Sequence, residues 1–225
     1  LYVEEIVKTL ALNEDSFVVE VACNDGYLLK NFVSANIPCV GIEPTAATAV
    51  VAENQGISVV REFFGQSLGR RLASEGRQAD LIIGNNVYAH VPDINDFTRG
   101  LKFLLKSNGT ITLEFPHVMR LIQNNQFDTV YHEHYSYLSL YTAMRVFSSA
   151  GLRIWNVEQL PTHGGSLRIY GCHENDVRKS MKAVTEVLKE ERNWGLQTRH
   201  VYGGFQAAAN WVKDELVTFL IEQKH

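Results

Sequence analysis

The chain has 225 residues, of which 45% are hydrophobic and 20% are charged, and these fractions are typical of an ordinary globular protein. Its formal net charge of −4 provides no general attraction to nucleic acid or to an anionic membrane surface, so neither is expected as a partner. The apolar runs all fall short of the roughly 20 residues that a membrane span requires, and we expect a cytoplasmic location.

Short β-rich runs alternate with amphipathic helical stretches over the first half of the chain. This alternation predicts an α/β fold with a mostly parallel sheet and helices on both faces. Gly56 is expected to end the third helix and Asp93 to cap the fifth. The expected strands cover residues 16–22, 38–43, 57–61, 79–84 and 110–115. The expected helices cover residues 3–12, 27–35, 45–56, 65–76 and 93–109.

The alternation breaks after Pro116, where a long polar segment begins. A helix is expected at residues 140–151, followed by two β-rich runs at residues 152–160 and 166–172 around the turn "PTHGG". Because strands joined by so tight a turn pair antiparallel, we expect an antiparallel strand near residues 166–172.

The last part of the chain, from Asp176 onward, is rich in Lys and Glu and has the pattern of helices. We therefore expect one domain over residues 1–175 and a helical extension over residues 176–225. Because the chain begins at Leu1 within an expected helix, we interpret it as a piece of a longer polypeptide, with the extension leading to a domain that this piece lacks.

The stretch "EVACNDGYLL" at residues 20–29 follows the first expected strand directly. In parallel α/β sheets the carboxyl ends of the strands form a crevice that suits a nucleotide-like ligand. Gly26 lets the backbone approach a ligand closely, and Asn24 and Asp25 can form hydrogen bonds with it. The pattern is not G-x-G-x-x-G, so a pyrophosphate cradle is not expected, and a plain structural turn is the alternative.

Two further strand ends carry polar side chains that would meet in the same crevice. Glu43, in "GIEP", is well placed to accept hydrogen bonds from ribose hydroxyls, with a solvated strand-end glutamate as the alternative. The fourth expected strand opens into "GNNVYAHVPD", which adds Asn85 and Asn86. Phe63 and Phe64 follow the third strand, where they would either cover an adenine ring or pack in the core.

The order E-x-A-x-N-D-G, then GIEP, then a strand ending NNVxAHVPD resembles the class I S-adenosylmethionine-dependent methyltransferases. The segments "FDTVYHEHYSY" at residues 127–137 and "THGGSLR" at residues 162–168 resemble the sugar C-methyltransferases, which methylate nucleotide-linked deoxy-ketosugars. The likeness runs from about Phe17 to Tyr170 and implies a Rossmann-like methyltransferase sheet with S-adenosylmethionine as the cofactor. We expect cofactor contacts from Glu20, Ala22, Asn24, Asp25, Gly26, Glu43, Pro44, Phe64, Asn85, Asn86, Val87 and His90.

This sequence departs from the family in two ways. Ala22 stands where the family usually has a glycine, and this change is expected to tighten the turn without abolishing cofactor binding. Family members also carry an N-terminal cysteine-rich zinc domain and a further C-terminal α/β domain, and neither is recognisable in these 225 residues. The second departure agrees with the interpretation of the chain as a piece of a longer protein.

His132 and His134 flank Glu133, and in an extended segment both imidazoles would point to one side, as in some metal sites. A further ligand would have to come from His90, His117 or His163, and no Asp or Cys completes a recognisable set. Cys23, Cys39 and Cys172 are too few and too scattered for a zinc knuckle or a disulfide framework. We therefore expect no metal. A polar loop without chemistry is a second interpretation, but it does not explain the density of titratable groups.

Acid/base catalysis is the third interpretation of this segment. Methylation of a carbon beside a ketone requires a proton to leave that carbon, and imidazole, with an ordinary pKa of about 6.5, suits a base at neutral pH. The resemblance implies that His134 is the base, with Tyr131 and Glu133 as its partners and His132 as the weaker candidate. A neighbouring carboxylate would orient the ring, and a tyrosine hydroxyl would stabilise the developing enolate oxygen.

Three other residues are weaker candidates for contact with a nucleotide-linked sugar, namely His117, His163 and Arg168. The alternatives are a turn residue beside two glycines for His163 and an ordinary strand arginine for Arg168. The function favoured by these patterns is C-methylation of a nucleotide-linked deoxy-ketosugar through base-assisted enolate formation. The alternatives are an O- or N-methyltransferase of another small molecule and a non-catalytic cofactor-binding module. The missing glycine fingerprint disfavours an NAD-dependent oxidoreductase.

Overall fold

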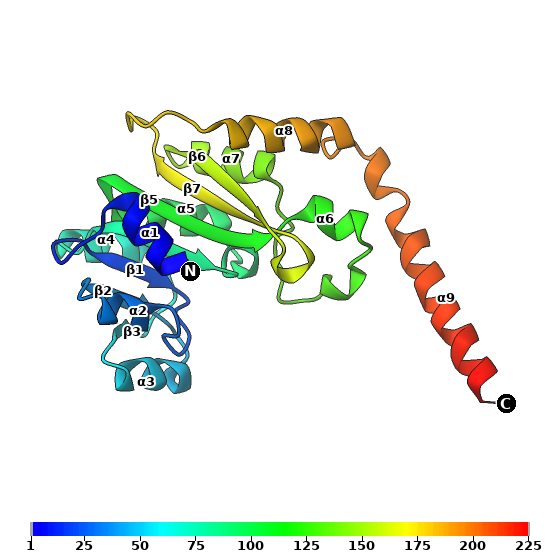
Figure 1. The fold of residues 1–225 in the computed structure, drawn as a ribbon, viewed down its shortest axis with the longest axis horizontal. Helices are drawn as coiled ribbons and strands as arrows, with labels where there is room; N and C mark the ends of the chain where they lie inside the picture. The colour runs from blue at the N-terminus through cyan, green and yellow to red at the C-terminus, as the bar shows by residue number, and fades with distance from the viewer. Residues whose placement is uncertain (1, 225) are drawn as a thin grey trace.

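The structure is a computed structural model that describes residues 2–224. Within these residues seven strands form one sheet in the order β3-β2-β1-β4-β5-β7-β6 (Figure 1). Neighbouring strands from β3 to β5 are parallel, whereas β7 is antiparallel to both β5 and β6. The predicted antiparallel strand near residues 166–172 is thus confirmed. The strands are β1 (Val18–Val21), β2 (Cys39–Ile42), β3 (Ser58–Val60), β4 (Ala79–Asn85), β5 (Leu105–Pro116), β6 (Leu152–Leu160) and β7 (Ser166–His173).

Helices cover both faces of the sheet, as predicted (Figure 1). One face buries apolar residues of α4, α5, α7 and α8, and the other buries apolar residues of α1, α2 and α3. The helices are α1 (Tyr2–Leu10), α2 (Leu29–Ser34), α3 (Ala46–Asn54), α4 (Gln66–Ser74), α5 (Ile94–Leu104), α6 (Val118–Gln123), α7 (Leu140–Ser149), α8 (Lys182–Trp194) and α9 (Phe205–Gln223). Short 3-10 turns are η1 (Tyr88–His90), η2 (Phe127–Thr129), η3 (Thr162–Gly164) and η4 (His200–Tyr202).

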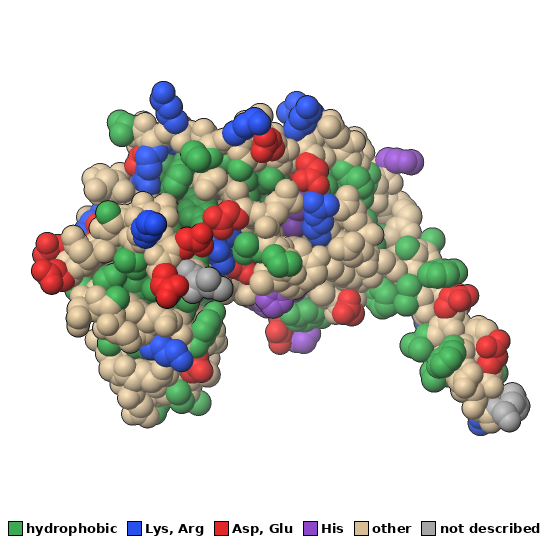
Figure 2. Space-filling model, in the orientation of Figure 1, with side chains coloured by type: hydrophobic (Ala, Val, Ile, Leu, Met, Phe, Trp, Pro, Cys, Tyr) green, Lys and Arg blue, Asp and Glu red, His purple; other side chains and the backbone are tan. Residues whose placement is uncertain are grey.

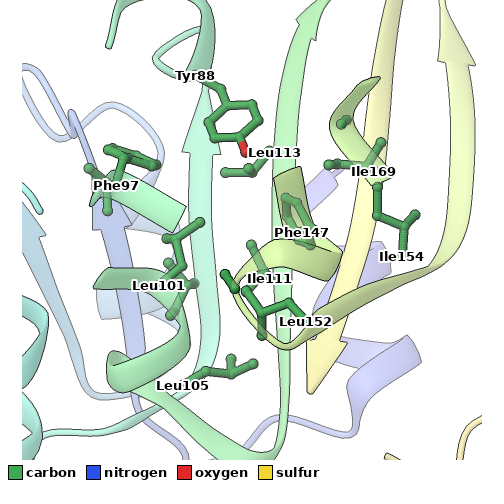
Figure 3. Packing of buried hydrophobic residues seen from close by; sticks show 14 of the residues in the cluster. Tyr88, Phe97, Leu101, Leu105, Ile111, Leu113, Phe147, Leu152, Ile154 and Ile169 are labelled. Atoms are coloured by element: carbon green, nitrogen blue, oxygen red, sulfur yellow. The ribbon is translucent and has the colours of Figure 1, made fainter. Parts of the chain in front are cut away.

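Helix α5 shows why the sequence folds in this way. Asp93 caps its first turn by accepting a hydrogen bond from the Asp96 backbone N–H at 2.9 Å. Phe97, Leu101 and Leu104 recur at helical spacing and are all buried against the sheet. Beside them the ring of Tyr88 is fully buried, and its hydroxyl is satisfied by the Thr98 hydroxyl at 2.8 Å (Figure 3). This core fixes the loop between β4 and α5, which carries several predicted site residues.

The prediction that α5 extends to residue 109 is wrong. The helix ends at Leu104, and residue Leu105 begins the long strand β5, where it is buried and pairs with Ala79 of β4. The Gln78 side-chain amide donates to the carbonyl oxygens of Phe103 and Leu105, so it satisfies carbonyl groups that the helix leaves open. Burial of Leu105 in the sheet therefore outweighs the helical pattern of the residues that follow it.

The C-terminal part is helical only from Lys182 onward, although helix was expected from Asp176. Helix α8 packs on the body of the domain and buries Val184 and Val187. Helix α9 extends away from the body and shows exposed hydrophobic side chains along its length (Figures 1 and 2), and none of the residues described for it is buried. The expected domain division after residue 175 stays a prediction. None of the helices within residues 2–224 is both long and apolar enough to cross a lipid bilayer.

Candidate active site

The carboxyl ends of β1, β2 and β4 border a cavity of about 550 Å³, a volume typical of a small-molecule site. Six of the predicted cofactor contacts line the cavity itself, namely Ala22, Glu43, Pro44, Phe64, Val87 and His90. The other six belong to the same strand ends or to the turn after β1, namely Glu20, Asn24, Asp25, Gly26, Asn85 and Asn86.

The turn after β1 has an alternating left-handed backbone. Ala22, Asn24 and Gly26 have φ angles of 60°, 51° and 80°. A left-handed conformation is unfavourable for alanine, so Ala22 stores strain that a glycine would not. A Cβ atom on Gly26 would lie 2.4 Å from the Ile57 side chain, so close packing as well as the φ angle requires glycine there. Ala22, which stands where the family usually has a glycine, is therefore a strained residue in the wall of the cavity.

Glu43 connects this turn to the end of β2. Its Oε2 accepts a hydrogen bond from the Asn24 backbone N–H at 3.2 Å, and its Oε1 accepts one from the Thr45 backbone N–H at 2.8 Å. The side chain is buried at the cavity wall. Each carboxylate oxygen retains a further lone pair, so the group is held in place and can still accept a hydrogen bond from a ligand.

Several polar atoms at the carboxyl ends of β1 and β4 are buried and have no hydrogen-bond partner among residues 2–224: Oε2 of Glu20 and the side-chain oxygens of Asn85 and Asn86. Burial, with the nearby Asp25 carboxylate, raises the pKa of Glu20 to about 8. The unpaired oxygens can accept hydrogen bonds from a ligand, and a cationic ligand would favour the ionised form of Glu20. The ammonium group of S-adenosylmethionine donates hydrogen bonds and its sulfonium group adds positive charge, so the residues present fit that cofactor.

Tyr27 lies near Glu20, although sequence reasoning did not assign it to the site, and about half of the residue is exposed. Burial raises the pKa of its hydroxyl, and the negative charge of Glu20 raises it further, so the two side chains lie within electrostatic reach of each other. In the sequence, Tyr27 begins an expected helix and stands next to apolar residues, a pattern typical of ordinary helix packing.

The far wall of the cavity contains Phe63 and Phe64, which were expected either to cover an adenine ring or to pack in the core. Phe63 at its rim is 86% exposed, whereas Phe64 packs edge-on against Phe97 with ring centroids 5.1 Å apart. Asp93, which caps α5, lies at this wall because the connection from β4 to α5 crosses the crevice. The residues not foreseen at the wall are Val21, Ile42, Glu62, Val91, Pro92, Asp93, Asp96 and Phe97.

The segment with the crowded histidines lies beside His90. The backbone N–H groups of Tyr135 and Ser136 both donate to the Ala89 carbonyl oxygen, at 2.9 and 3.2 Å. The imidazole rings of His90 and His134 consequently pack against each other with centroids 4.7 Å apart. Since His90 lines the cavity, this contact places His134 next to the cavity wall.

His134 is held in one tautomer by its surroundings. Its Nδ1 lies 2.9 Å from the Thr129 carbonyl oxygen, which can only accept a hydrogen bond, so Nδ1 carries the proton. Its Nε2 is then unprotonated and lies 3.3 Å from the Tyr131 hydroxyl. Burial lowers the pKa of His134, and the neighbouring His90 and His163 lower it further. The ring is therefore neutral near pH 7, and the lone pair on Nε2 accepts the hydrogen bond of the Tyr131 hydroxyl.

His132 and Glu133 do not share this environment. The residues form a turn in which the His134 backbone N–H donates to the Tyr131 carbonyl oxygen, rather than the extended segment that would align both imidazoles. The side chains of His132 and Glu133 are 90% and 62% exposed. A backbone carbonyl, not the expected carboxylate, orients the His134 ring. Within residues 2–224 no three His, Cys, Asp or Glu side chains are grouped to hold a metal ion.

The weaker candidates separate into two groups. His163 is near the crevice, because the Asn86 side-chain amide donates to its Nε2 at 3.0 Å. His117 is only 1% exposed, and its Nε2 contacts Glu191 at 3.0 Å. The Arg168 guanidinium forms an ion pair with Glu114 at 2.7 Å and stacks on the Tyr2 ring. We therefore assign His117 and Arg168 to the structure of the fold and keep only His163 as a substrate-contact candidate.

The sequence and the fold are both similar to known methyltransferases. A methyltransferase domain family matches residues 2–157, and the family of C-methyltransferase C-terminal domains matches residues 161–225. The C-methyltransferase NovU of Streptomyces niveus is 33% identical over 214 residues, which are 95% of this chain and 51% of that protein. The chain thus spans about half the length of this relative.

Two solved structures illustrate the similarity of the fold. A magnesium protoporphyrin IX methyltransferase from Synechocystis with bound S-adenosylhomocysteine has a TM-score of 0.58 and 14% identity, and the match covers 76% of this chain and 82% of that one. An S-adenosylmethionine-dependent methyltransferase from Clostridium acetobutylicum has a TM-score of 0.59 and 13% identity, with coverage of 76% and 89%. At these identities the likeness concerns the fold alone.

Proposed function

The chain belongs to the class I S-adenosylmethionine-dependent methyltransferases, and on that basis we propose that it carries the cofactor site and the catalytic base of a sugar C-methyltransferase. The substrate in this proposal is a nucleotide-linked deoxy-ketosugar, methylated at the carbon beside its ketone. The similarity to a C-methyltransferase over 95% of the chain supports the reaction type. The observation that carries the proposal is the neutral His134, with an unprotonated Nε2, next to the cavity wall.

The cofactor would be held by the strand ends that border the cavity. Glu43 would accept hydrogen bonds from the ribose hydroxyls, and Phe63 and Phe64 would cover the adenine ring. The unsatisfied oxygens of Glu20 and Asn85 would meet the positively charged end of the molecule. When bound, S-adenosylmethionine supplies an electrophilic methyl group on its sulfonium centre.

Proton transfer is the task of the chain's own residues in this proposal. Nε2 of His134 takes the proton from the carbon beside the ketone, and the electrons of the broken C–H bond move into an enolate. The Tyr131 hydroxyl, now 3.3 Å from Nε2, donates a hydrogen bond to the enolate oxygen that develops. The enolate carbon would then take the methyl group: a carbon–carbon bond would form as the methyl–sulfur bond breaks, the sulfur would keep that electron pair as S-adenosylhomocysteine leaves, and the ketone would re-form. Binding that aligns the two reacting carbons supplies much of the acceleration.

Product analysis tests this proposal directly. The protein is incubated with S-adenosylmethionine carrying an isotope-labelled methyl group and with a panel of nucleotide-linked deoxy-ketosugars, alongside the corresponding sugars with a hydroxyl in place of the ketone. We expect NMR to find the label on a carbon next to the ketone and no label on the reduced sugars. Label on oxygen or nitrogen would instead assign an O- or N-methyltransferase. Cofactor binding without transfer to any sugar would contradict the proposed catalysis.

A further inference from the structure

Glu191 of α8 is a fully buried carboxylate with a complete set of hydrogen-bond donors. Its Oε1 accepts from the Leu140 backbone N–H at 2.6 Å and contacts His117 Nε2 at 3.0 Å. Its Oε2 accepts from the Tyr141 backbone N–H at 3.0 Å. The two backbone groups belong to the first turn of α7, where the helix dipole favours a negative charge. A buried charge is tolerated when it is satisfied in this way.

The donors that Glu191 joins lie at the two ends of one segment. His117 follows the end of β5, and Leu140 begins α7, so residues 118–139 form the loop between them. This loop carries His134. A backbone hydrogen bond from Val118 N–H to the Leu138 carbonyl oxygen, 3.0 Å long, also brings the ends of the loop together. Glu191 is thus the side chain that fixes both ends of the loop to the same helix.

Helix α8 holds the loop at a second, neighbouring point. Glu190 forms an ion pair with Arg120 of α6 at 2.6 Å, and the Arg120 guanidinium also donates to Gln159 of β6. This pair is partly exposed, so its contribution is small compared with that of a buried network. The central part of the loop, by contrast, has no buried side chain from residue 122 to residue 137 within the described structure. Its placement therefore depends on its ends and on hydrogen bonds to two backbone carbonyls, those of Gly164, which accepts from Asn124 and Gln126, and of Ala89.

We propose that Glu191 is a positioning residue that sets the placement of His134 by holding both ends of residues 118–139 on α8. The proposal deepens, and rests on, the proposed role of His134 as the base. The carboxylate touches neither the cavity nor the reacting atoms. It fixes the start of the loop through His117 and the end of the loop through the amino-terminal turn of α7. With both ends of the loop fixed, the backbone N–H groups of Tyr135 and Ser136 are held in position to donate to Ala89, and these hydrogen bonds bring His134 to the cavity.

Amide hydrogen exchange measured by mass spectrometry tests this inference without any substrate. Glu191→Gln keeps the size of the side chain but replaces one carboxylate oxygen with an amide NH₂. One of the N–H groups that now donates to the carboxylate would then face another donor. We expect exchange in peptides covering residues 124–141 to be about 10-fold faster than in the parent protein, with β1, β4 and α5 unchanged. Glu186→Gln on the same helix is the matched control, because Glu186 is solvent-exposed and pairs only with Lys182 in the described structure. It should exchange like the parent.

A milder pair of variants keeps the inference testable if Glu191→Gln folds poorly. His117→Gln retains an amide donor near the position of Nε2, whereas His117→Leu removes the donor. We expect faster exchange of residues 124–141 in His117→Leu and nearly parental exchange in His117→Gln. Parental exchange of the loop in both Glu191→Gln and His117→Leu would overturn the proposal, and so would faster exchange spread evenly over the whole domain.

Binding and turnover separate this inference from the proposed function. Calorimetry should give the same S-adenosylhomocysteine affinity, within about twofold, for Glu191→Gln and the parent, because the cavity is not altered. On a ketosugar that the parent methylates, kcat should fall about 10-fold while KM changes little, since a misplaced base slows the chemical step. If the parent methylates no ketosugar but the loop still loosens in Glu191→Gln, the proposed function fails and the structural role of Glu191 stands. A lower cofactor affinity without a looser loop would contradict the positioning role.

Discussion

The Tyr131 hydroxyl lies 3.3 Å from Nε2 of His134, on the side of the ring opposite the Thr129 carbonyl that fixes Nδ1. Nδ1 is held by a hydrogen bond to the backbone, whereas Nε2 contacts a side-chain hydroxyl and can accept a proton from a substrate. This arrangement also places a hydrogen-bond donor next to the nitrogen that would receive a proton. A base and an oxyanion donor side by side are what enolate formation beside a ketone requires.

Glu43 should contribute to cofactor affinity. Glu43→Ala is expected to weaken S-adenosylmethionine binding by about 1–3 kcal/mol, because ribose hydroxyls and the backbone N–H groups of Asn24 and Thr45 would lose their acceptor. Calorimetric titration measures the change, with circular dichroism to show that the variant is folded. Glu53→Gln is the control, since Glu53 is a surface glutamate paired with Arg61. An unchanged dissociation constant in folded Glu43→Ala would remove Glu43 from the site.

Ala22 should limit the stability of the domain. Because its φ angle is 60°, Ala22→Gly is expected to raise the free energy of unfolding by up to about 1 kcal/mol, as the relief of left-handed strain exceeds the added backbone entropy. Urea unfolding measures this difference. The control is Ala47→Gly in the exposed part of α3, which should lower the stability by about 1 kcal/mol. Equal losses in both variants would show that Ala22 is not strained.

Glu20 should make the stability of the cofactor-free protein depend on pH. Its pKa of about 8 in the folded state lies above the ordinary value of 4.5, so the folded protein retains a proton that the unfolded chain releases. The free energy of unfolding therefore falls as pH rises through this window. Glu20→Gln should lack that part of the decline and be the more stable protein above the window. Parallel pH profiles for the two proteins would contradict the burial of an unsatisfied carboxylate.

The acid limb of catalysis should follow the pKa of His134. The reaction needs the neutral ring, so the rate is full above this pKa and is lost as pH falls through it. Burial and the neighbouring His90 lower the pKa, whereas Glu133 raises it. NMR titration of the His134 ring should therefore show a higher pKa in His90→Gln and a lower pKa in Glu133→Gln. Shifts of the same sign in both variants would show that the ring is not coupled to these neighbours.

The sequence was sufficient to predict the sheet and the edge of the sheet at which the cavity lies. Alternating β-rich and helical patterns are local, and parallel strands bring their carboxyl ends to one edge whatever the details of packing. This is why Glu43 and His90 were both expected at the crevice and both line the cavity. The end of α5 was misplaced, because the choice between helix and strand at Leu105 depends on its pairing with Ala79, which is a tertiary contact.

The chemistry of the histidine segment was less predictable. An extended segment was considered only for the metal interpretation, and no turn was predicted. The structure has a turn at residues 131–134, which leaves His132 exposed to solvent and packs His134 against His90. The carbonyl of Thr129, which orients His134, leaves no signal in the sequence because every residue has one. Glu191 lies 74 residues beyond its partner His117, in a stretch that reads as an ordinary charged helix. Buried polar contacts between such distant residues are visible only in the folded chain.

Hydrogen exchange in heavy water is the most direct test of His134 as the base. With S-adenosylhomocysteine bound and no methyl donor present, the parent protein should exchange the hydrogen beside the ketone of a nucleotide-linked ketosugar for deuterium. His134→Ala should bind S-adenosylhomocysteine normally and exchange about 10²–10⁴-fold more slowly, whereas the exposed His132→Ala should exchange like the parent. Exchange by His134→Ala at the parental rate would contradict the claim that Nε2 of His134 removes the proton.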